Sequence, residues 1–174
     1  MADSGDPSRP GDELIPDANL VFDRERTIAA PPAQVWPWLL QLGKRRAGWY
    51  MPQSVERFVP RRRRALWRID SRWQTLEVGD RIPDYGGRNA HLELARIDSP
   101  HLLVYRDRRR GTPFSWAITL TPVAGGSTRV HLRFRGRLQS TGLKRRALIA
   151  AGDLFDAVTG ELMLRGLDER ATKP

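Results

Sequence analysis

Few residues of this chain are of a type that could carry acid–base chemistry, and one pair is spaced to act together. His91 and Glu93 lie two positions apart in an alternating segment, so both side chains point to the same face of a strand. An imidazole and a carboxylate held side by side can pass a proton to or from a bound substrate. The same spacing arises on any solvent-facing strand, which is the alternative to a catalytic pair.

Two further carboxylates are candidate polar anchors for a ligand. Glu56 falls in a predicted short helix, and Asp80 follows Gly79 in a predicted strand. Each also has the simpler role of a surface ion-pair partner, because the chain contains 27 arginines. The sequence has no cysteine and shows no glycine-rich phosphate loop, nucleophile elbow or paired metal ligands. It therefore predicts no metal site and no cofactor.

Aromatic residues are concentrated between residues 30 and 50, where the sequence reads APPAQVWPWLLQLGKRRAGWY. Trp36 lies beside Val35 and Leu39 at helical spacing and is predicted to fill the core. Trp49 and Tyr50 follow this helix and either line a pocket or pack in the core. A buried tyrosine hydroxyl needs a hydrogen-bond partner, and a ligand oxygen could supply one.

Other candidates for lining a pocket share an apolar or aromatic side chain on a predicted strand or on the last helix. The strand candidates are Trp73, Tyr105, Trp116 and Phe134, and the helix candidates are Phe155, Leu162 and Met163. Conventional packing of a sheet against a helix is the alternative for each of them. A sheet that curves around one helix leaves room along its length, and large apolar pockets hold lipophilic ligands.

The elements that position these residues follow from periodicity and turn signals. A first strand begins near Leu20, and Pro31 and Pro32 start a short helix that ends at Gly43. A second short helix is predicted from Met51 to Val59. Alternation then predicts strands over residues 73–82, 90–97, 101–107, 113–123 and 127–138. The last helix runs from Asp153 or Asp156 to about Ala171, and the preceding residues 139–152 form either a short helix or a connector.

Charge is distributed unevenly along the chain, whose formal net charge is +10. Residues 1–23 contain six acids and one arginine, and we expect residues 1–20 to form a flexible acidic tail before one domain over residues 21–172. His131, Arg133, Arg135 and Arg137 alternate with apolar residues, which predicts a solvent-exposed basic sheet face. The arginine clusters favour a solvated surface, with an anionic membrane or nucleic acid as the less favoured partner.

This order of elements resembles the START-like or SRPBCC superfamily, which includes polyketide cyclases, lipid-transfer domains and pathogenesis-related plant proteins. The resemblance covers roughly residues 20–172. It is carried by the segments TIAAPPAQVWPWLLQLG, RAGWY, WQTLEVGDRI, IDSPHLLVY and FSWAITLTPV. It implies an α+β helix-grip fold, in which a curved antiparallel sheet wraps around a long C-terminal helix and two short helices follow the first strand. It also implies an elongated, mostly apolar cavity.

We therefore expect a protein that binds or transports a small hydrophobic ligand, which is lipid-like, polyketide-like or aromatic. One alternative is an enzyme of the polyketide cyclase or dehydrase kind. The other is a basic surface protein that associates with nucleic acid or an anionic membrane. The N-terminus lacks the basic start and apolar centre of a secretion signal, so the expected location is the cytoplasm. The sequence leaves the oligomeric state open.

Overall fold

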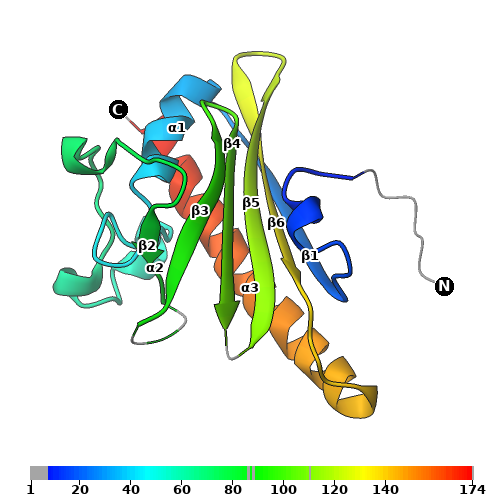
Figure 1. Ribbon diagram of the computed structural model, residues 1–174. Coiled ribbons are helices and arrows are strands. Elements are labelled where there is room, and N and C mark those ends of the chain that lie inside the picture. Colours follow the sequence, from blue (N-terminus) through cyan, green and yellow to red (C-terminus); the bar gives the residue numbers. More distant parts are fainter. Residues whose placement is uncertain (1–7, 86, 88, 110, 174) are drawn as a thin grey trace.

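A curved antiparallel sheet with a long helix across its concave face forms the body of the molecule (Figure 1). The computed structural model describes residues 8–85, 87, 89–109 and 111–173. The strands pair in the order β1-β6-β5-β4-β3-β2, so the first strand lies beside the last. Their bounds are β1 Leu20–Ile28, β2 Arg81–Pro83, β3 His91–Asp98, β4 Leu102–Arg109, β5 Thr112–Val123 and β6 Ser127–Gly136.

Two short helices follow β1, and the long helix is the last element. Their bounds are α1 Pro32–Leu40, α2 Gln53–Glu56 and α3 Gly142–Thr172, and three 3₁₀ turns cover η1 Asp12–Leu14, η2 Arg61–Arg63 and η3 Ser71–Trp73. This order confirms the predicted α+β helix-grip fold. Across the described residues, none of these helices combines the length and apolar character that a membrane span requires.

The core lies between the concave face of the sheet and the second half of α3. Trp116 and Ile118 of β5 stand opposite Phe134 and Leu132 of β6, so that apolar side chains of adjacent strands share one face. The helix contributes three fully buried residues to this core, which are Met163, Leu164 and Leu167. Of the three helix residues predicted to face the stripes of β5 and β6, Met163 lies in this core.

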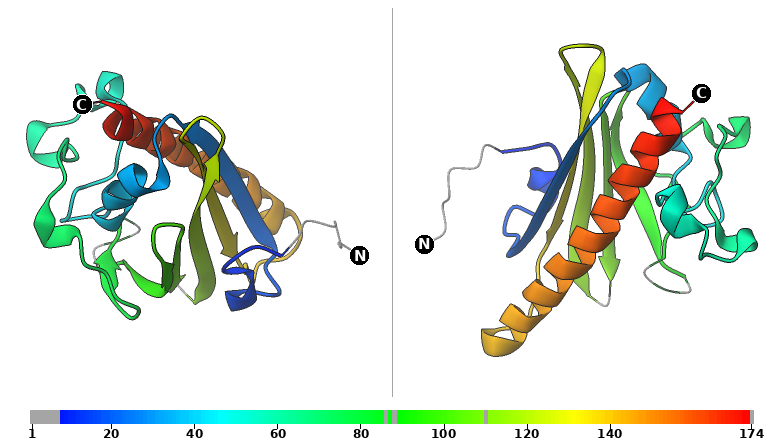
Figure 2. Two further views of the ribbon diagram at one scale, coloured as in Figure 1. Left: turned by 90° about the horizontal axis from the view of Figure 1, so that it is seen from above. Right: turned by 180° about the vertical axis from the view of Figure 1, so that it is seen from behind.

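Helix α3 is longer than the periodicity predicted, because it begins at Gly142 and includes most of the segment that the sequence left undecided. It crosses the sheet obliquely, and its first turns extend past the end of the strands (Figure 2). Gly166 lets α3 approach the segment after α1 closely, since a Cβ on Gly166 would lie 2.5 Å from the backbone nitrogen of Met51. A Cβ on Gly160 would lie 3.4 Å from the side chain of Arg24, which is an ordinary distance.

Two predicted elements are shorter than expected. The strand over residues 73–82 is reduced to β2, because Gly79 has a φ of 98° and Asp80 accepts a hydrogen bond from the Glu77 amide in a tight turn. This turn interrupts the alternation that the sequence suggested. The helix over residues 51–59 is the single turn α2, which Pro52 precedes.

Residues 9–19 lie against the outer face of the sheet, although we expected residues 1–20 to form a flexible tail. Leu14 packs beside Leu102, Val104 and Ala117, and Ile15 is buried. A Cβ on Gly11 would lie 3.0 Å from the Val104 side chain. This segment therefore docks on the sheet through apolar contacts. Residues 1–7 of the predicted tail lie outside the described residues.

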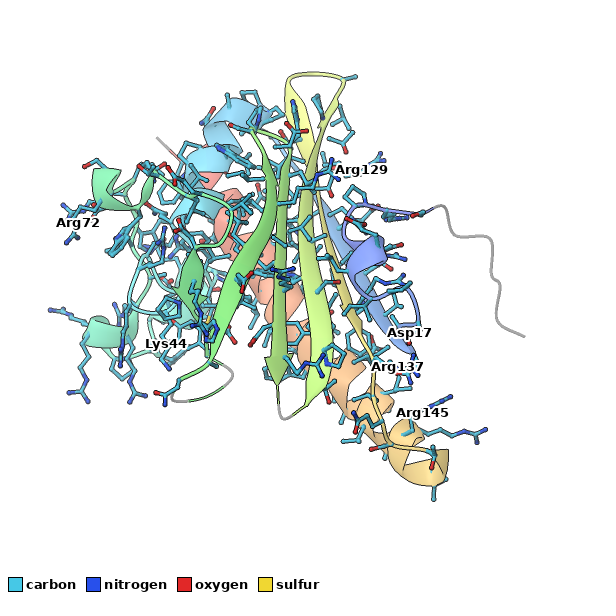
Figure 3. The ribbon with its side chains drawn as sticks, viewed as in Figure 1. Asp17, Lys44, Arg72, Arg129, Arg137 and Arg145 are labelled. Carbon is cyan, nitrogen blue, oxygen red and sulfur yellow. The ribbon has the colours of Figure 1, made fainter. Side chains whose placement is uncertain are left out.

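Ion pairs also join this segment to the basic stripe on β6. Arg133 is 4% exposed, and its guanidinium binds Asp12 at 2.8 Å and Asp23 at 2.8 Å. Arg135 pairs with Asp12, and Arg137 pairs with Asp17 (Figure 3). The outer face near β6 is therefore partly covered and neutralised, which corrects the prediction of an exposed basic face. The early carboxylates that suggested a tail are the counter-ions of this stripe.

A buried ion pair fixes the segment after α1 onto the end of α3. The Arg170 side chain is fully buried and its Nη2 donates to Glu56 at 2.6 Å. Its other N–H groups donate to the carbonyl oxygens of Leu66, Met51 and Gly166. Burying a charge is costly unless it is paired and its hydrogen bonds are made, and both conditions hold here.

We predict opposite effects for the same substitution at two glycines of α3. Gly166→Ala should lower the free energy of unfolding by about 1–3 kcal/mol, because its Cβ would overlap the Met51 backbone. Gly160→Ala should raise it by up to about 1 kcal/mol, because alanine favours the helix and the space is adequate. Urea denaturation measures both values. Equal effects would contradict the close approach at Gly166.

Loss of the Arg170 charge should destabilise the fold strongly. Arg170→Met leaves Glu56 buried without its cation, and we expect a loss of about 3–5 kcal/mol. Arg165→Met is the matched control, because Arg165 is exposed on the same helix, and its effect should stay within about 0.5 kcal/mol. Denaturant titration compares the two variants. A loss at Arg170 no larger than the control would show that the pair does not hold the segment.

Candidate functional site

Three aromatic rings form a stack on the concave face of the sheet. Tyr105 of β4 and Trp116 of β5 are cross-strand partners, so their side chains share a face. Their ring centroids lie 5.8 Å apart with the planes at 27°. Trp49, from the segment between α1 and α2, stacks on the other side of Trp116 at 5.9 Å and 29°. Two strands thus hold two of the rings, and a connecting segment supplies the third.

A small cavity lies beside this stack. Its volume is about 20 Å³, which is room for about one water molecule. The residues that line it are mostly apolar, and they are Leu42, Gly43, Trp49, Ile82, Pro83, Asp84, Tyr85, Leu92, Tyr105 and Trp116. The family resemblance implied an elongated cavity, and this cavity among the described residues is far smaller than that. Aromatic side chains occupy much of the space instead.

The polar groups at this cavity are few. The Tyr105 hydroxyl makes no hydrogen bond with any residue that the structure describes. Burial raises the pKa of Tyr105, with the nearby Arg46 opposing this shift, so the phenol stays protonated and can donate. Asp84 and the half-exposed Tyr85 border the same space. A ligand oxygen at this position would therefore meet a hydroxyl donor.

Arg46 lies close to the cavity and was not singled out from the sequence. Its aliphatic chain would lie 3.3 Å from a Cβ on Gly43, which is a lining residue. Its Nη2 donates to the carbonyl oxygens of Leu40 and Trp73, whereas its buried Nε has no partner among the described residues. Burial lowers the pKa of Arg46, and nearby Tyr105 and Asp80 oppose that shift. The signal in the sequence was an arginine within the basic loop just before GWY.

A second, larger depression lies on the surface along residues 68–72 and has a volume of about 400 Å³. It is open and polar. The Asp70 carboxylate within it already binds Arg72 at 2.6 Å, and this contact lowers the pKa of Asp70 to about 2. Its walls come from one short loop rather than from the concave sheet. We therefore take the aromatic cavity as the candidate site.

Each member of the predicted catalytic pair contacts a different arginine in the structure. His91 contacts Arg81, whereas Glu93 binds Arg106 at 2.6 Å. Both side chains lie opposite the buried Leu92 and Leu94 and so point away from the cavity. Neither borders the aromatic stack.

Tyr50 and Glu56, predicted to line or anchor a ligand site, have protein partners. The Tyr50 hydroxyl donates to the Trp38 carbonyl oxygen at 2.7 Å. Glu56 accepts hydrogen bonds from Arg170 and from the Trp67 indole. Both side chains are buried, and their hydrogen-bonding capacity serves the packing between α1, α2 and α3.

The other predicted lining residues are spread over several places. Trp73 lies under the Arg46 and Arg72 guanidinium groups, and Asp80 is exposed in its turn. Phe134 stacks between Phe22 and Phe114 in a separate aromatic group. Met163 is fully buried in the core, and Leu162 is half-buried.

Phe155 corrects the prediction for the last helix. We expected it to face the sheet with Leu162 and Met163, but its side chain is 71% exposed. Gly152, one turn before Phe155, meets the Phe22 ring, and Gly160 meets the Arg24 side chain. The glycine side of α3 therefore packs on β1, and the side that carries Phe155 faces outward.

Comparisons with known proteins agree with this architecture. A sequence profile of the family described as "Polyketide cyclase / dehydrase and lipid transport" matches residues 20–171. No protein with a curated description matches the chain.

Solved structures share the fold at low sequence identity. A protein from Mesorhizobium loti is 20% identical, with a TM-score of 0.50 over 88% of this chain and 99% of that chain. One from Chromobacterium violaceum is 14% identical, with a TM-score of 0.52 over 88% and 98%. A Staphylococcus aureus protein of unknown function is 10% identical, with a TM-score of 0.56 over 87% and 93%. At these identities the similarity concerns the fold alone.

The profile match spans all six strands of the sheet and α3 except for its last residue. It confirms the START-like resemblance that the sequence segments indicated. The chain therefore belongs to the polyketide cyclase/dehydrase and lipid-transport family, whose fold is a hydrophobic ligand-binding fold.

Proposed function

We propose that this protein binds a small, flat hydrophobic ligand against Trp116. The observation that carries the proposal is the aromatic stack beside a cavity whose Tyr105 hydroxyl has no protein partner among the described residues. A planar ligand can stack on an indole face, and a single donor can orient its oxygen. The family description supports a hydrophobic ligand, and the aromatic wall favours a ring system over an acyl chain.

Binding requires the space to enlarge, because the cavity has a volume of about 20 Å³ and drug-sized ligands need several hundred. Trp49 and Tyr85 are the side chains that would move. Tyr85 is 54% exposed, and Trp49 is partly buried on a connecting segment rather than on a strand. Tyr105 and Trp116, which two paired strands hold, would stay in place. A ligand ring would thus replace the Trp49 indole on Trp116.

We propose binding without a reaction. His91 and Glu93 point away from the cavity, and the polar side chains at its border suit the orientation of an oxygen. Tyr105 remains protonated at neutral pH because burial raises its pKa, so it serves as a hydrogen-bond donor.

A naphthalene probe, 1-anilinonaphthalene-8-sulfonate, tests the aromatic wall. We expect the protein to bind it with quenching of tryptophan fluorescence, and Trp116→Phe should weaken binding severalfold, because a smaller ring offers less stacking area. Phe58→Leu is the control, since Phe58 is 78% exposed and lies outside the cavity lining, and it should leave affinity unchanged. Equal affinity in both variants would remove Trp116 from the site.

Removal of the Tyr105 hydroxyl tests the polar part of the proposal. For 2-naphthol, which carries one oxygen, Tyr105→Phe should reduce affinity about fivefold, since a hydrogen bond contributes about 1 kcal/mol. Stability should not fall, because this hydroxyl has no partner in the described part of the chain. Isothermal calorimetry and thermal melting provide the two readouts, with naphthalene as the control ligand that lacks the oxygen. An unchanged affinity for 2-naphthol would mean that Tyr105 does not orient the ligand.

A further inference from the structure

The described side chains of the first half of α3 include an exposed apolar face. Leu143, Leu154, Phe155 and Val158 are 82%, 68%, 71% and 51% exposed, and Leu148 is 43% exposed. At about 100° per residue, these five side chains fall within an arc of about 140°. Large apolar side chains gathered on one exposed surface are unfavourable in water. Such a surface indicates a site where a partner binds.

The position of this face in the fold explains why it is uncovered. Phe155 and Gly166 are eleven residues apart, which is about three helical turns, so they lie on nearly the same side of α3. At Gly166 that side is covered by the backbone of Met51, which Arg170 holds in place. The covering segment does not reach Phe155. The helix packs on β1 through its other residues, since Gly152 at the flank of the face meets Phe22 and Gly160 on the opposite side meets Arg24.

Positive charge without an ion-pair partner among the described residues lies beside this face. Arg145 and Arg146 are exposed in the first turns of α3, and at about 100° per residue they fall on either side of the apolar arc. Arg145 lies at the same end of the molecule as Arg137, whose charge Asp17 neutralises (Figure 3). The acidic residues of this half-helix are engaged, because Arg24 binds Asp153 at 2.6 Å and Asp156 at 3.5 Å. The apolar face is therefore bordered by cations.

We propose that the first half of α3 docks the protein onto the surface of an anionic phospholipid bilayer. Exposed leucine, valine and phenylalanine side chains would enter the boundary between headgroups and acyl chains, and Arg145 and Arg146 would bind lipid phosphates. The net charge of +10 favours this occupant over a second copy of the chain, because two copies would bring like charges together. This surface differs from the aromatic cavity, so the inference goes beyond ligand binding.

Co-sedimentation of the full chain with vesicles tests the proposal. We compare vesicles of phosphatidylcholine alone with vesicles in which phosphatidylglycerol replaces a third of it. We expect binding to the anionic vesicles, weak binding to the neutral ones, and a loss of affinity as salt rises, because salt screens the contribution of the arginines. Arg145→Gln together with Arg146→Gln should weaken binding to anionic vesicles about tenfold or more.

Two valines provide a matched pair for the apolar contribution. Val158→Glu on the face should weaken vesicle binding about tenfold. The change removes an apolar side chain that would enter the bilayer and adds a charge that the anionic lipids repel. Val78→Glu makes the same change at a 63% exposed valine outside α3 and should leave binding unchanged. Phe155→Glu is a second variant on the face, with an effect at least as large as that of Val158→Glu. Thermal melting confirms that each variant is folded, as exposed positions should permit.

Three results would overturn the proposal. The first is the absence of binding to anionic vesicles at low salt. The second is binding that Phe155→Glu and Val158→Glu reduce no more than Val78→Glu, which would mean that charge alone attracts the protein. The third is a concentration-dependent dimer in sedimentation equilibrium that Phe155→Glu abolishes, which would assign the face to a second copy. Trp116→Phe should leave vesicle binding unchanged, so a failure here is separable from a failure of the ligand site.

Discussion

The contact between Arg170 and Glu56 determines how much of the long helix is covered. A guanidinium withdrawn from water must have its N–H groups satisfied, and here one carboxylate and the carbonyl oxygens of Leu66, Met51 and Gly166 do so. These acceptors lie on the segment between α1 and β2 as well as on α3 itself. Their hydrogen bonds with Arg170 therefore fix the position of the segment on the helix. It covers the second half of the helix and stops short of the first half.

The same segment carries Trp49, and its anchoring therefore also shapes the candidate site. Tyr105 and Trp116 are held by strand pairing, so their positions are a property of the sheet. Trp49 reaches Trp116 from a connection without regular structure, which makes it the adjustable part of the stack. A rigid wall opposite an adjustable one suits a protein whose family binds hydrophobic molecules and whose cavity volume is about 20 Å³.

Charge is sorted by the fold rather than spread over the surface. The early acids Asp12, Asp17 and Asp23 pair on the outer face with Arg133 and Arg135 of β6 and with Arg137 just after it. Helix α3 uses Asp153 and Asp156 to bind Arg24 of β1. The net positive charge thus remains in the connections and at the start of α3, next to exposed apolar side chains. This arrangement places the cationic and apolar features of the chain at the same end of the helix.

Local pattern in the sequence was enough to predict the strands after residue 90, the start of α1 at its prolines and the helix-grip order, because alternation and turn residues act over short distances. It also identified Trp49, Tyr105 and Trp116 as candidates for one site. Pattern alone could not tell which side of α3 would pack, since that helix has apolar residues on two sides and glycines on the side that meets β1. Nor could it pair Glu56 with Arg170, or Asp12 with Arg133, because these partners are more than a hundred residues apart in the sequence. Contacts at that separation depend on how the sheet and helix come together, and only the tertiary structure decides them.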